Sequence, residues 1–151
     1  MAYKKHFETL WNQKSVVFRG DDEILALFNS IVDHTPDGGE YFAFGVPPLT
    51  KKWNDMSERF VQKMEKKGVK EKVIMDETSK DLISLDKKYP GVQVKTIPKE
   101  HMTPAEVDIY GNKVAIILWS KIPQAFVIDN KEVANSFKKY FEIMWGIAKK
   151  V

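Results

Sequence analysis

The best-placed pair of acidic residues in this chain is Asp76-Glu77, which ends a predicted strand. In an open α/β sheet, small molecules bind beyond the carboxyl ends of the strands, so two carboxylates at such an end mark a candidate ligand site. Gly45, which ends an earlier predicted strand, and His101, in the loop 98–104, gain weight from the same rule. A plain turn, with Asp76 at its start and Glu77 in solvent, also accounts for the pair.

The other side chains suited to binding a ligand are the indole rings of Trp53 and Trp119. An indole ring stacks on the face of a sugar, and the same ring fills a protein core. Trp119 ends an apolar run and precedes Ser120-Lys121, so it can line a pocket whose rim Trp53 covers. Packing in the core or at an interface is the alternative for both residues.

The composition excludes several kinds of chemistry. The 151 residues include no cysteine, which excludes disulfides, zinc–thiolate sites and thiol catalysis. The three histidines form no pair at metal-ligand spacing. The chain also has no Gly-x-Ser-x-Gly nucleophile turn, no phosphate-binding Gly-rich loop followed by Lys, and no Gly-x-Gly-x-x-Gly cofactor turn. We therefore predict no catalytic residue, no metal and no cofactor.

Length and hydropathy bound the class of protein. A chain of 151 residues that is 43% hydrophobic can bury the core of one domain. Its longest apolar run, 114–119, is far shorter than the roughly 20 residues that span a bilayer. The N-terminal residues contain no apolar stretch of signal-peptide length. These features predict a cytoplasmic protein with no membrane partner.

Lysines supply nearly all of the positive charge. Lys and Arg total 24 against 21 Asp and Glu, for a net charge of +3, and only Arg19 and Arg59 are arginines. Surfaces that read nucleic acid favour Arg, because its planar group makes two hydrogen bonds at once. We interpret the lysine doublets mainly as solvated helix faces, and direct nucleic-acid contact through them is the alternative. The doublets are Lys51-Lys52, Lys66-Lys67, Lys87-Lys88 and Lys138-Lys139.

Hydrophobic periodicity and turn residues predict an α/β domain. Strands are predicted over 15–19, 40–45, 70–76, 92–97, 107–110, 113–119 and 125–128. Helices are predicted over 2–13, 21–32, 53–67 and 79–88, with a closing helix that starts near residue 130. The order strand 40–45, helix 53–67, strand 70–76 is that of a parallel crossover unit. Gly111-Asn112 between two apolar strands predicts a hairpin.

The order and spacing of these segments resemble a known regulatory module. The resemblance is carried by the segments SVVFRGDDEILALF, EYFAFG and MEKKGVKEKVIMD, and by the tail IYGNKVAIILW…AFVIDNKEVANSFKKYFEIMWGIAKK. Together they resemble the effector domain of archaeal TrmB-like transcriptional regulators, a branch of the phospholipase-D-like fold. The resemblance implies a mixed sheet flanked by helices over 14–151. It also implies that residues 1–13 form a helix left from a dimerising linker.

Phospholipase-D-like enzymes use a His-x-Lys-x4-Asp motif, in which the histidine attacks phosphorus and the lysine neutralises phosphate oxygens. His101 and Asp108 fall at this spacing, but Thr103 stands in the lysine position. Pro104 would also distort a strand there. We therefore expect no phosphodiesterase activity.

These observations together predict a non-catalytic sensor domain used in transcriptional control. We expect a homodimer that uses Phe7, Leu10 and Trp11, and a small-molecule effector such as a sugar or another metabolite. The candidate ligand-binding residues are Gly45, Trp53, Asp76, Glu77, His101 and Trp119. DNA would be reached only through a separate or missing winged-helix domain. The alternatives are a degenerate hydrolase with a site near Asp76 and His101, and a nucleic-acid binder that uses its lysine faces.

Overall fold

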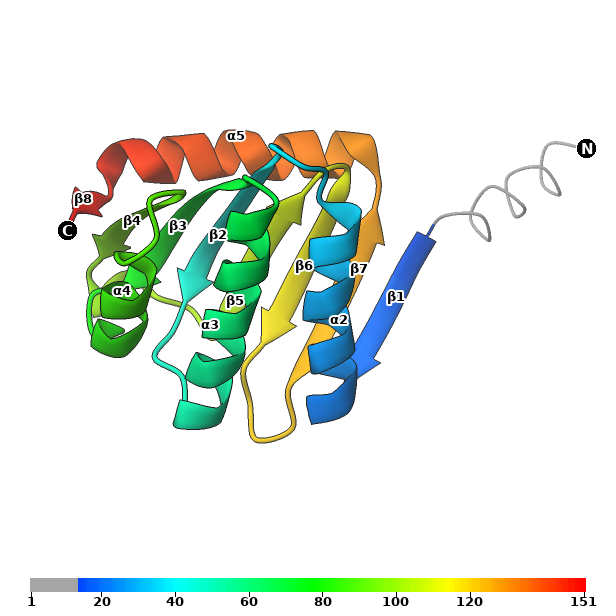
Figure 1. Ribbon diagram of the computed structural model, residues 1–151, viewed down its shortest axis with the longest axis horizontal. Coiled ribbons are helices and arrows are strands. Elements are labelled where there is room, and N and C mark those ends of the chain that lie inside the picture. The colour runs from blue at the N-terminus through cyan, green and yellow to red at the C-terminus, as the bar shows by residue number, and fades with distance from the viewer. Residues whose placement is uncertain (1–13) are drawn as a thin grey trace, which may run out of the picture.

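The computed structural model describes residues 14–151, and its centre is an eight-stranded mixed sheet (Figure 1). The strands follow the order β1-β7-β6-β5-β2-β3-β4-β8 across the sheet. They are β1 (Lys14–Arg19), β2 (Glu40–Val46), β3 (Lys70–Asp76), β4 (Val92–Ile97), β5 (Ala105–Tyr110), β6 (Lys113–Leu118), β7 (Gln124–Asp129) and β8 (Lys149–Lys150). The helices are α2 (Asp21–His34), α3 (Lys51–Lys66), α4 (Lys80–Asp86) and α5 (Lys131–Ile147), with a short 3-10 turn η1 (Lys99–His101).

The predicted crossover unit forms the centre of the fold. β2 pairs in parallel with β3, and β3 pairs in parallel with β4, while β5, β6 and β7 pair antiparallel with their neighbours. α3 connects β2 to β3 and ends before Gly68, whose φ of 67° is the left-handed conformation expected after a helix C-terminus. The fold is therefore the mixed α/β sheet that the sequence predicts.

Helices cover both faces of the sheet (Figure 1). α2, α3 and α4 lie on one face, and α5 runs across the strands on the other. Alternate residues of β2 separate in the same way: Tyr41 and Ala43 pack beneath α2–α4, whereas Phe42 and Phe44 pack against α5. This alternation follows from the two-residue repeat of a strand. Side chains of the central strands therefore have little access to solvent on either face.

α5 is fixed at both of its ends. Its first turn is capped by Asn130, whose side-chain oxygen accepts a hydrogen bond from the Val133 N–H at 3.1 Å. Near its last turn, the Lys95 ammonium donates to the Trp145 carbonyl at 2.8 Å and lies 4.5 Å from the centre of the Trp145 ring. Trp145 therefore packs within the domain, which is one of the roles that its position on the closing helix predicts.

The two outer strands differ. β8 pairs with β4 through Thr96↔Lys149 and Lys95↔Lys150. At the other end, β1 pairs with β7 only, as far as the described residues extend. Val16 and Val17 of β1 are 50% and 58% exposed.

The predicted bounds of the elements are confirmed to within two residues. α2 is longer than predicted and α4 is shorter, while α3 starts at Lys51 because Thr50 already has extended backbone at the N-cap. β5 begins at Ala105, directly after Pro104, so the proline precedes the strand and does not distort it. β8 was not predicted, because two lysines carry no strand signal.

The predicted helix over 2–13 lies outside the described residues. None of the helices between residues 14 and 151 is long and apolar enough to cross a membrane.

Gly45 is a glycine for a structural reason. Its φ is 74°, and the register of β2 against β3 shifts between Ala43 and Val46 around it. A Cβ atom at this position would lie 2.5 Å from the carbonyl oxygen of Ala105 on the neighbouring strand. Only a residue without a side chain allows β2 and β5 to approach so closely.

We predict that Gly45→Ala lowers the free energy of unfolding by more than Gly111→Ala does. Gly111 also has a positive φ, of 59°, but nothing lies within 4 Å of a Cβ there, so this variant measures the backbone strain alone, about 1–2 kcal/mol. The collision at position 45 should add about 1–3 kcal/mol. Urea unfolding of both variants measures the difference, and equal losses would show that the close approach of β2 and β5 has no energetic weight.

Candidate functional site

Four carboxyl groups lie buried between the sheet and helices α2–α4. We call them the acid cluster: Glu71 on β3, Asp86 on α4, and Glu106 and Asp108 on β5. Their exposed fractions are 2%, 5%, 4% and 0%. Acidic side chains are almost never so completely buried unless they are paired.

The sheet register explains why these acids point inward. Glu71 pairs with Tyr41 across β2 and β3, so both side chains share the face beneath the helices. Asp108 pairs with Ala43 on one side and with Ala115 on the other. Since alanine is small, the Asp108 carboxyl has room between its neighbours without reaching solvent.

Half of the eight carboxyl oxygens of the acid cluster lack a partner. The Trp119 indole N–H donates to Glu106 Oε1 at 2.9 Å. Among the described residues, however, Glu71 Oε2, Asp86 Oδ1 and both oxygens of Asp108 are buried without a hydrogen-bond partner. Each such group forfeits about 1–3 kcal/mol of hydrogen bonding to water.

No cation neutralises the cluster within residues 14–151. The ion pairs in this part of the chain join Lys51 to Asp55, Lys52 to Asp21 and Lys113 to Asp129, all outside the cluster. Although the chain carries a net charge of +3, none of these paired lysines contacts the acid cluster.

Burial therefore favours the protonated forms of these acids. It raises the pKa of Glu71 from 4.5 to about 9, with further contributions from the charges of Asp86 and Glu65. Burial, assisted by Glu106, raises the pKa of Asp86 from 3.8 to about 7. Burial also raises the pKa of Glu106, and it raises the pKa of Asp108 well above its usual range with help from the Glu106 charge.

Tyr41 lies among these acids. Burial raises its pKa first, and the charges of Asp108, Glu106 and Glu71 raise it further, so the hydroxyl keeps its proton. The hydroxyl is close enough to Asp108 to lower the pKa of that carboxyl, although neither Asp108 oxygen has a partner at hydrogen-bond geometry. Tyr41 therefore contributes a polar proton to a site that otherwise holds carboxyl groups.

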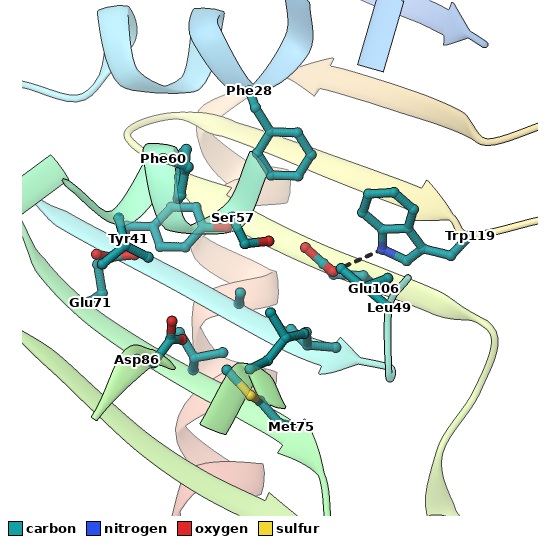
Figure 2. Close-up of a pocket in the computed structure, with 15 residues that line it drawn as sticks. Phe28, Tyr41, Leu49, Ser57, Phe60, Glu71, Met75, Asp86, Glu106 and Trp119 are labelled. Atoms are coloured by element: carbon teal, nitrogen blue, oxygen red, sulfur yellow. Dashed lines mark hydrogen bonds between the residues drawn. The ribbon is translucent and has the colours of Figure 1, made fainter. Parts of the chain in front are cut away.

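A cavity of about 50 Å³ adjoins the acid cluster (Figure 2). Glu71, Asp86 and Glu106 all line it. Aromatic side chains form much of its remaining wall: Phe28, Tyr41, Phe60 and Trp119. Figure 2 places Glu71 and Asp86 on one side of the cavity and Glu106 across from them, beside Trp119.

The structure brings together two of the candidate ligand residues. The Trp53 and Trp119 rings lie 5.2 Å apart, centre to centre, and Trp119 also stacks on Phe28 at 6.3 Å. Trp119 lines the cavity, whereas Trp53 is 8% exposed and packs behind it. The two indoles are therefore in contact, with Trp119 on the cavity wall and Trp53 in the core, which is the alternative role given for Trp53.

Of the other candidates, Gly45 lies in β2 and does not line the cavity, and the remaining three lie at the carboxyl ends of β3 and β4. Asp76 Oδ1 accepts hydrogen bonds from the Thr78 N–H and hydroxyl, each at 2.8 Å, so Asp76 starts a turn. Glu77 is exposed, and its N–H donates to the Ile97 carbonyl at 3.2 Å. His101 lies exposed in η1. None of these three residues lines the cavity beside the acid cluster.

The residues at the spacing of the phosphodiesterase motif do not share a strand. His101 is exposed in η1 and Thr103 is exposed in the following loop, whereas Asp108 is fully buried on β5. Two residues on one strand do project into one region, as that chemistry requires, but they are Glu106 and Asp108. A pair of carboxyls offers no histidine nucleophile and no positive group for the phosphate oxygens.

The acid cluster itself was missed in the sequence. Its signal is an acid at every second position of a strand, Glu106 and Asp108, and a further acid within β3. Two acids on either side of a valine are equally typical of a strand whose acidic face is exposed to solvent. Glu71 lies between Lys70 and Lys72, so the sequence around it is also typical of an exposed strand. Within residues 14–151 no three His, Cys, Asp or Glu side chains are arranged to hold a metal ion.

No model of a known protein family matches the sequence, and no curated protein matches it. Solved structures do share the fold. TrmBL2, an archaeal chromatin protein whose structure shows a novel mode of DNA binding, superposes with a TM-score of 0.64 at 17% identity, over 99% of this chain. The superposed part is 63% of TrmBL2, so this chain spans less than two thirds of that protein.

Phospholipase D structures match over their whole length. Nuc from Salmonella typhimurium, a phospholipase D family member, gives a TM-score of 0.69 at 18% identity, over 93% of this chain and 99% of Nuc. NucT from Helicobacter pylori gives 0.68 at 18% identity, over 91% of this chain and 99% of NucT. The chain therefore has the phospholipase-D-like fold, in a form shared with TrmBL2, and the fold implied by the sequence resemblance is confirmed.

We predict that the stability of the fold decreases as the pH rises. Between about pH 5 and 8, Glu71 is protonated in the folded chain and ionised in the unfolded chain, since its pKa rises from 4.5 to about 9 on folding. Unfolding then releases a proton, so a higher pH favours the unfolded state. Glu71→Gln removes this proton, and its stability advantage over the parent chain should grow by about 1.4 kcal/mol for each pH unit.

Urea unfolding at several pH values between 5 and 8 measures this slope. Glu77→Gln is the matched control, because Glu77 is an exposed acid just beyond the same strand and should leave the slope unchanged. Parallel pH profiles for Glu71→Gln and the parent chain would contradict the burial of a protonated Glu71.

Proposed function

We propose that this chain is a non-catalytic sensor domain, which binds a small-molecule effector and acts in transcriptional control as a homodimer. The observation that carries the proposal is the cavity beneath α2–α4, with buried carboxyls that lack partners and an aromatic wall. A pocket with few polar groups in an apolar surround is the usual form of a small-molecule site. The fold shared with the chromatin protein TrmBL2 supports the regulatory context.

The charges at the cavity support a binding role over phosphodiester hydrolysis. Hydrolysis needs a nucleophile and a positive group near the phosphate oxygens. The acidic side chains that line the cavity are Glu71, Asp86 and Glu106, and neither a histidine nor a cation lies among the lining residues. The cavity therefore supplies neither group that hydrolysis needs. The degenerate-hydrolase alternative, centred on Asp76 and His101, has one carboxyl held in a turn and one exposed ring.

DNA contact belongs to the proposal in an indirect form. TrmBL2 binds DNA, and this chain corresponds to 63% of its length. We propose that a separate winged-helix domain contacts DNA. The α/β domain of this chain would transmit the effector signal to that winged-helix domain. The alternative, direct binding through the exposed lysines, predicts an affinity for duplex DNA that falls steeply with salt.

We predict that an effector raises the melting temperature while phosphodiester substrates are left intact. A thermal-shift screen of sugars, nucleotides, amines and other metabolites tests the first part, because a ligand at 100 times its dissociation constant adds about 2.7 kcal/mol of stability. Incubation with a chromogenic phosphodiester tests the second. Turnover that is lost in Asp76→Ala, with the fold intact, would replace the sensor proposal with the hydrolase.

A second prediction concerns the oligomeric state. Light scattering should give twice the chain mass of 17.5 kDa. Leu10→Asp combined with Trp11→Asp should give a monomer, because apolar anchors supply most of the energy of an interface. Glu132→Ala is the control, since Glu132 is exposed on α5 and has no part in the proposed interface. A stable monomer of the parent chain at high concentration would contradict the dimer.

A further inference from the structure

We infer that the cavity binds a short aliphatic diamine, with one ammonium group near Glu71 and Asp86 and the other near Glu106. The inference rests on the proposed function, because it names the class of effector that the same site would take.

Glu71 and Asp86 line the cavity, and one oxygen of each, Glu71 Oε2 and Asp86 Oδ1, is buried without a hydrogen-bond partner. Glu71 and Asp86 are 2% and 5% exposed, so bulk water does not solvate them. A buried carboxylate is stabilised by a donor that also carries positive charge. An ammonium group supplies both, with three N–H donors.

The walls suit the carbon chain of such a ligand. The Phe28 and Trp119 rings stack 6.3 Å apart, and the Tyr41 and Phe60 rings lie 5.2 Å apart. Aromatic faces attract ammonium groups and pack against methylene groups. Figure 2 shows Tyr41 beside Glu71 and Trp119 beside Glu106, with Phe60 and Phe28 between them.

The size of the cavity favours a short chain. Its volume is about 50 Å³, and a water-sized atom requires roughly 10–15 Å³ on this measure. A ligand of about four or five non-hydrogen atoms therefore fits. Ser57 and Leu49, which are only half-buried, line the same cavity and mark the side from which a ligand can enter.

A metal ion and a sugar fit less well. The described residues hold no group of three potential ligands arranged for a metal ion. The Tyr41 and Ser57 hydroxyls on the cavity wall can donate to a sugar, but a sugar brings no positive charge to Glu71, Asp86 and Glu106. The Trp119 N–H, which is a donor on this wall, is already used by Glu106.

Binding exchanges a proton for an ammonium group. In the ligand-free chain, Glu71 keeps its proton up to about pH 8 because burial raises its pKa to about 9, whereas Asp86, with a pKa raised to about 7, keeps its proton only below about pH 7. The charged groups that face them are Glu65 on α3 and Glu106 on β5, and both are acidic. An alkylammonium group, with a pKa near that of lysine at about 10.4, stays protonated. Each protonated carboxyl that pairs with an ammonium group therefore releases one proton to solvent.

The test is titration calorimetry of the full chain with 1,3-diaminopropane. We expect one ligand per chain, and an affinity that increases up to about tenfold per pH unit between pH 6 and 8 for each proton displaced. Titration in buffers with different ionisation enthalpies measures the number of protons released. The matched probe 1,3-propanediol has the same length and no charge, and we expect it not to bind.

Two variants test the site itself. Glu71→Gln and Asp86→Asn should each weaken diamine binding at least tenfold while raising the midpoint of urea unfolding, since each removes a buried acid. Damage to the fold would lower both quantities, so this opposite response separates a ligand contact from misfolding. Asp81→Asn is the control on the same helix, because Asp81 is exposed and should change neither quantity.

Three results would overturn the inference: equal binding of the diamine and the diol, diamine binding that survives both variants, or stabilisation by Mg²⁺ in place of the diamine. If the screen finds a different effector whose binding is lost in Glu71→Gln, the diamine is wrong but the sensor proposal stands. Phosphodiester turnover would remove the sensor proposal itself.

Discussion

The constraint on which this structure depends is that helices cover both faces of its central strands. α5 seals one face of the sheet and α2–α4 seal the other, so an inward side chain of β3 or β5 must find its partners within the protein. Apolar residues meet this condition by packing. Buried acids at the same positions either retain their protons, remain unpaired or bind a ligand. The four residues of the acid cluster occupy such positions.

Sharing a fold does not fix the chemistry at its centre. Nuc and NucT superpose on this chain over nearly their full lengths, at 18% identity. The pair that β5 of this chain presents to the interior is Glu106 and Asp108. Main-chain pairing and apolar packing hold the scaffold together, so a shared fold does not require the same side chains at its centre.

The sequence predicted the architecture well because that architecture is recorded in local patterns. Gly68 ends α3, Asn130 starts α5 and Gly111-Asn112 closes a hairpin, and each effect needs only neighbouring residues. The position of the acid cluster is not local. A strand covered on both faces shows no clear alternation, so the sequence does not indicate which side of Lys70–Asp76 lies beneath α4. The strand-end rule drew attention to Asp76 and Glu77, whereas the unpartnered carboxyls lie further back along the strands.

The unequal ends of the sheet affect how copies of this protein can meet. At the β4 end, the short β8 occupies backbone groups with a pair of lysines, whose charge repels a second copy presenting the same edge. At the β1 end, a six-residue strand leaves one row of backbone groups without a strand partner among the described residues, next to exposed Val16 and Val17. Any growth of the sheet by strand addition is therefore directional. Crowded or partly unfolded preparations should aggregate through β1, where a lysine or proline substitution on the outer edge would act as a gatekeeper.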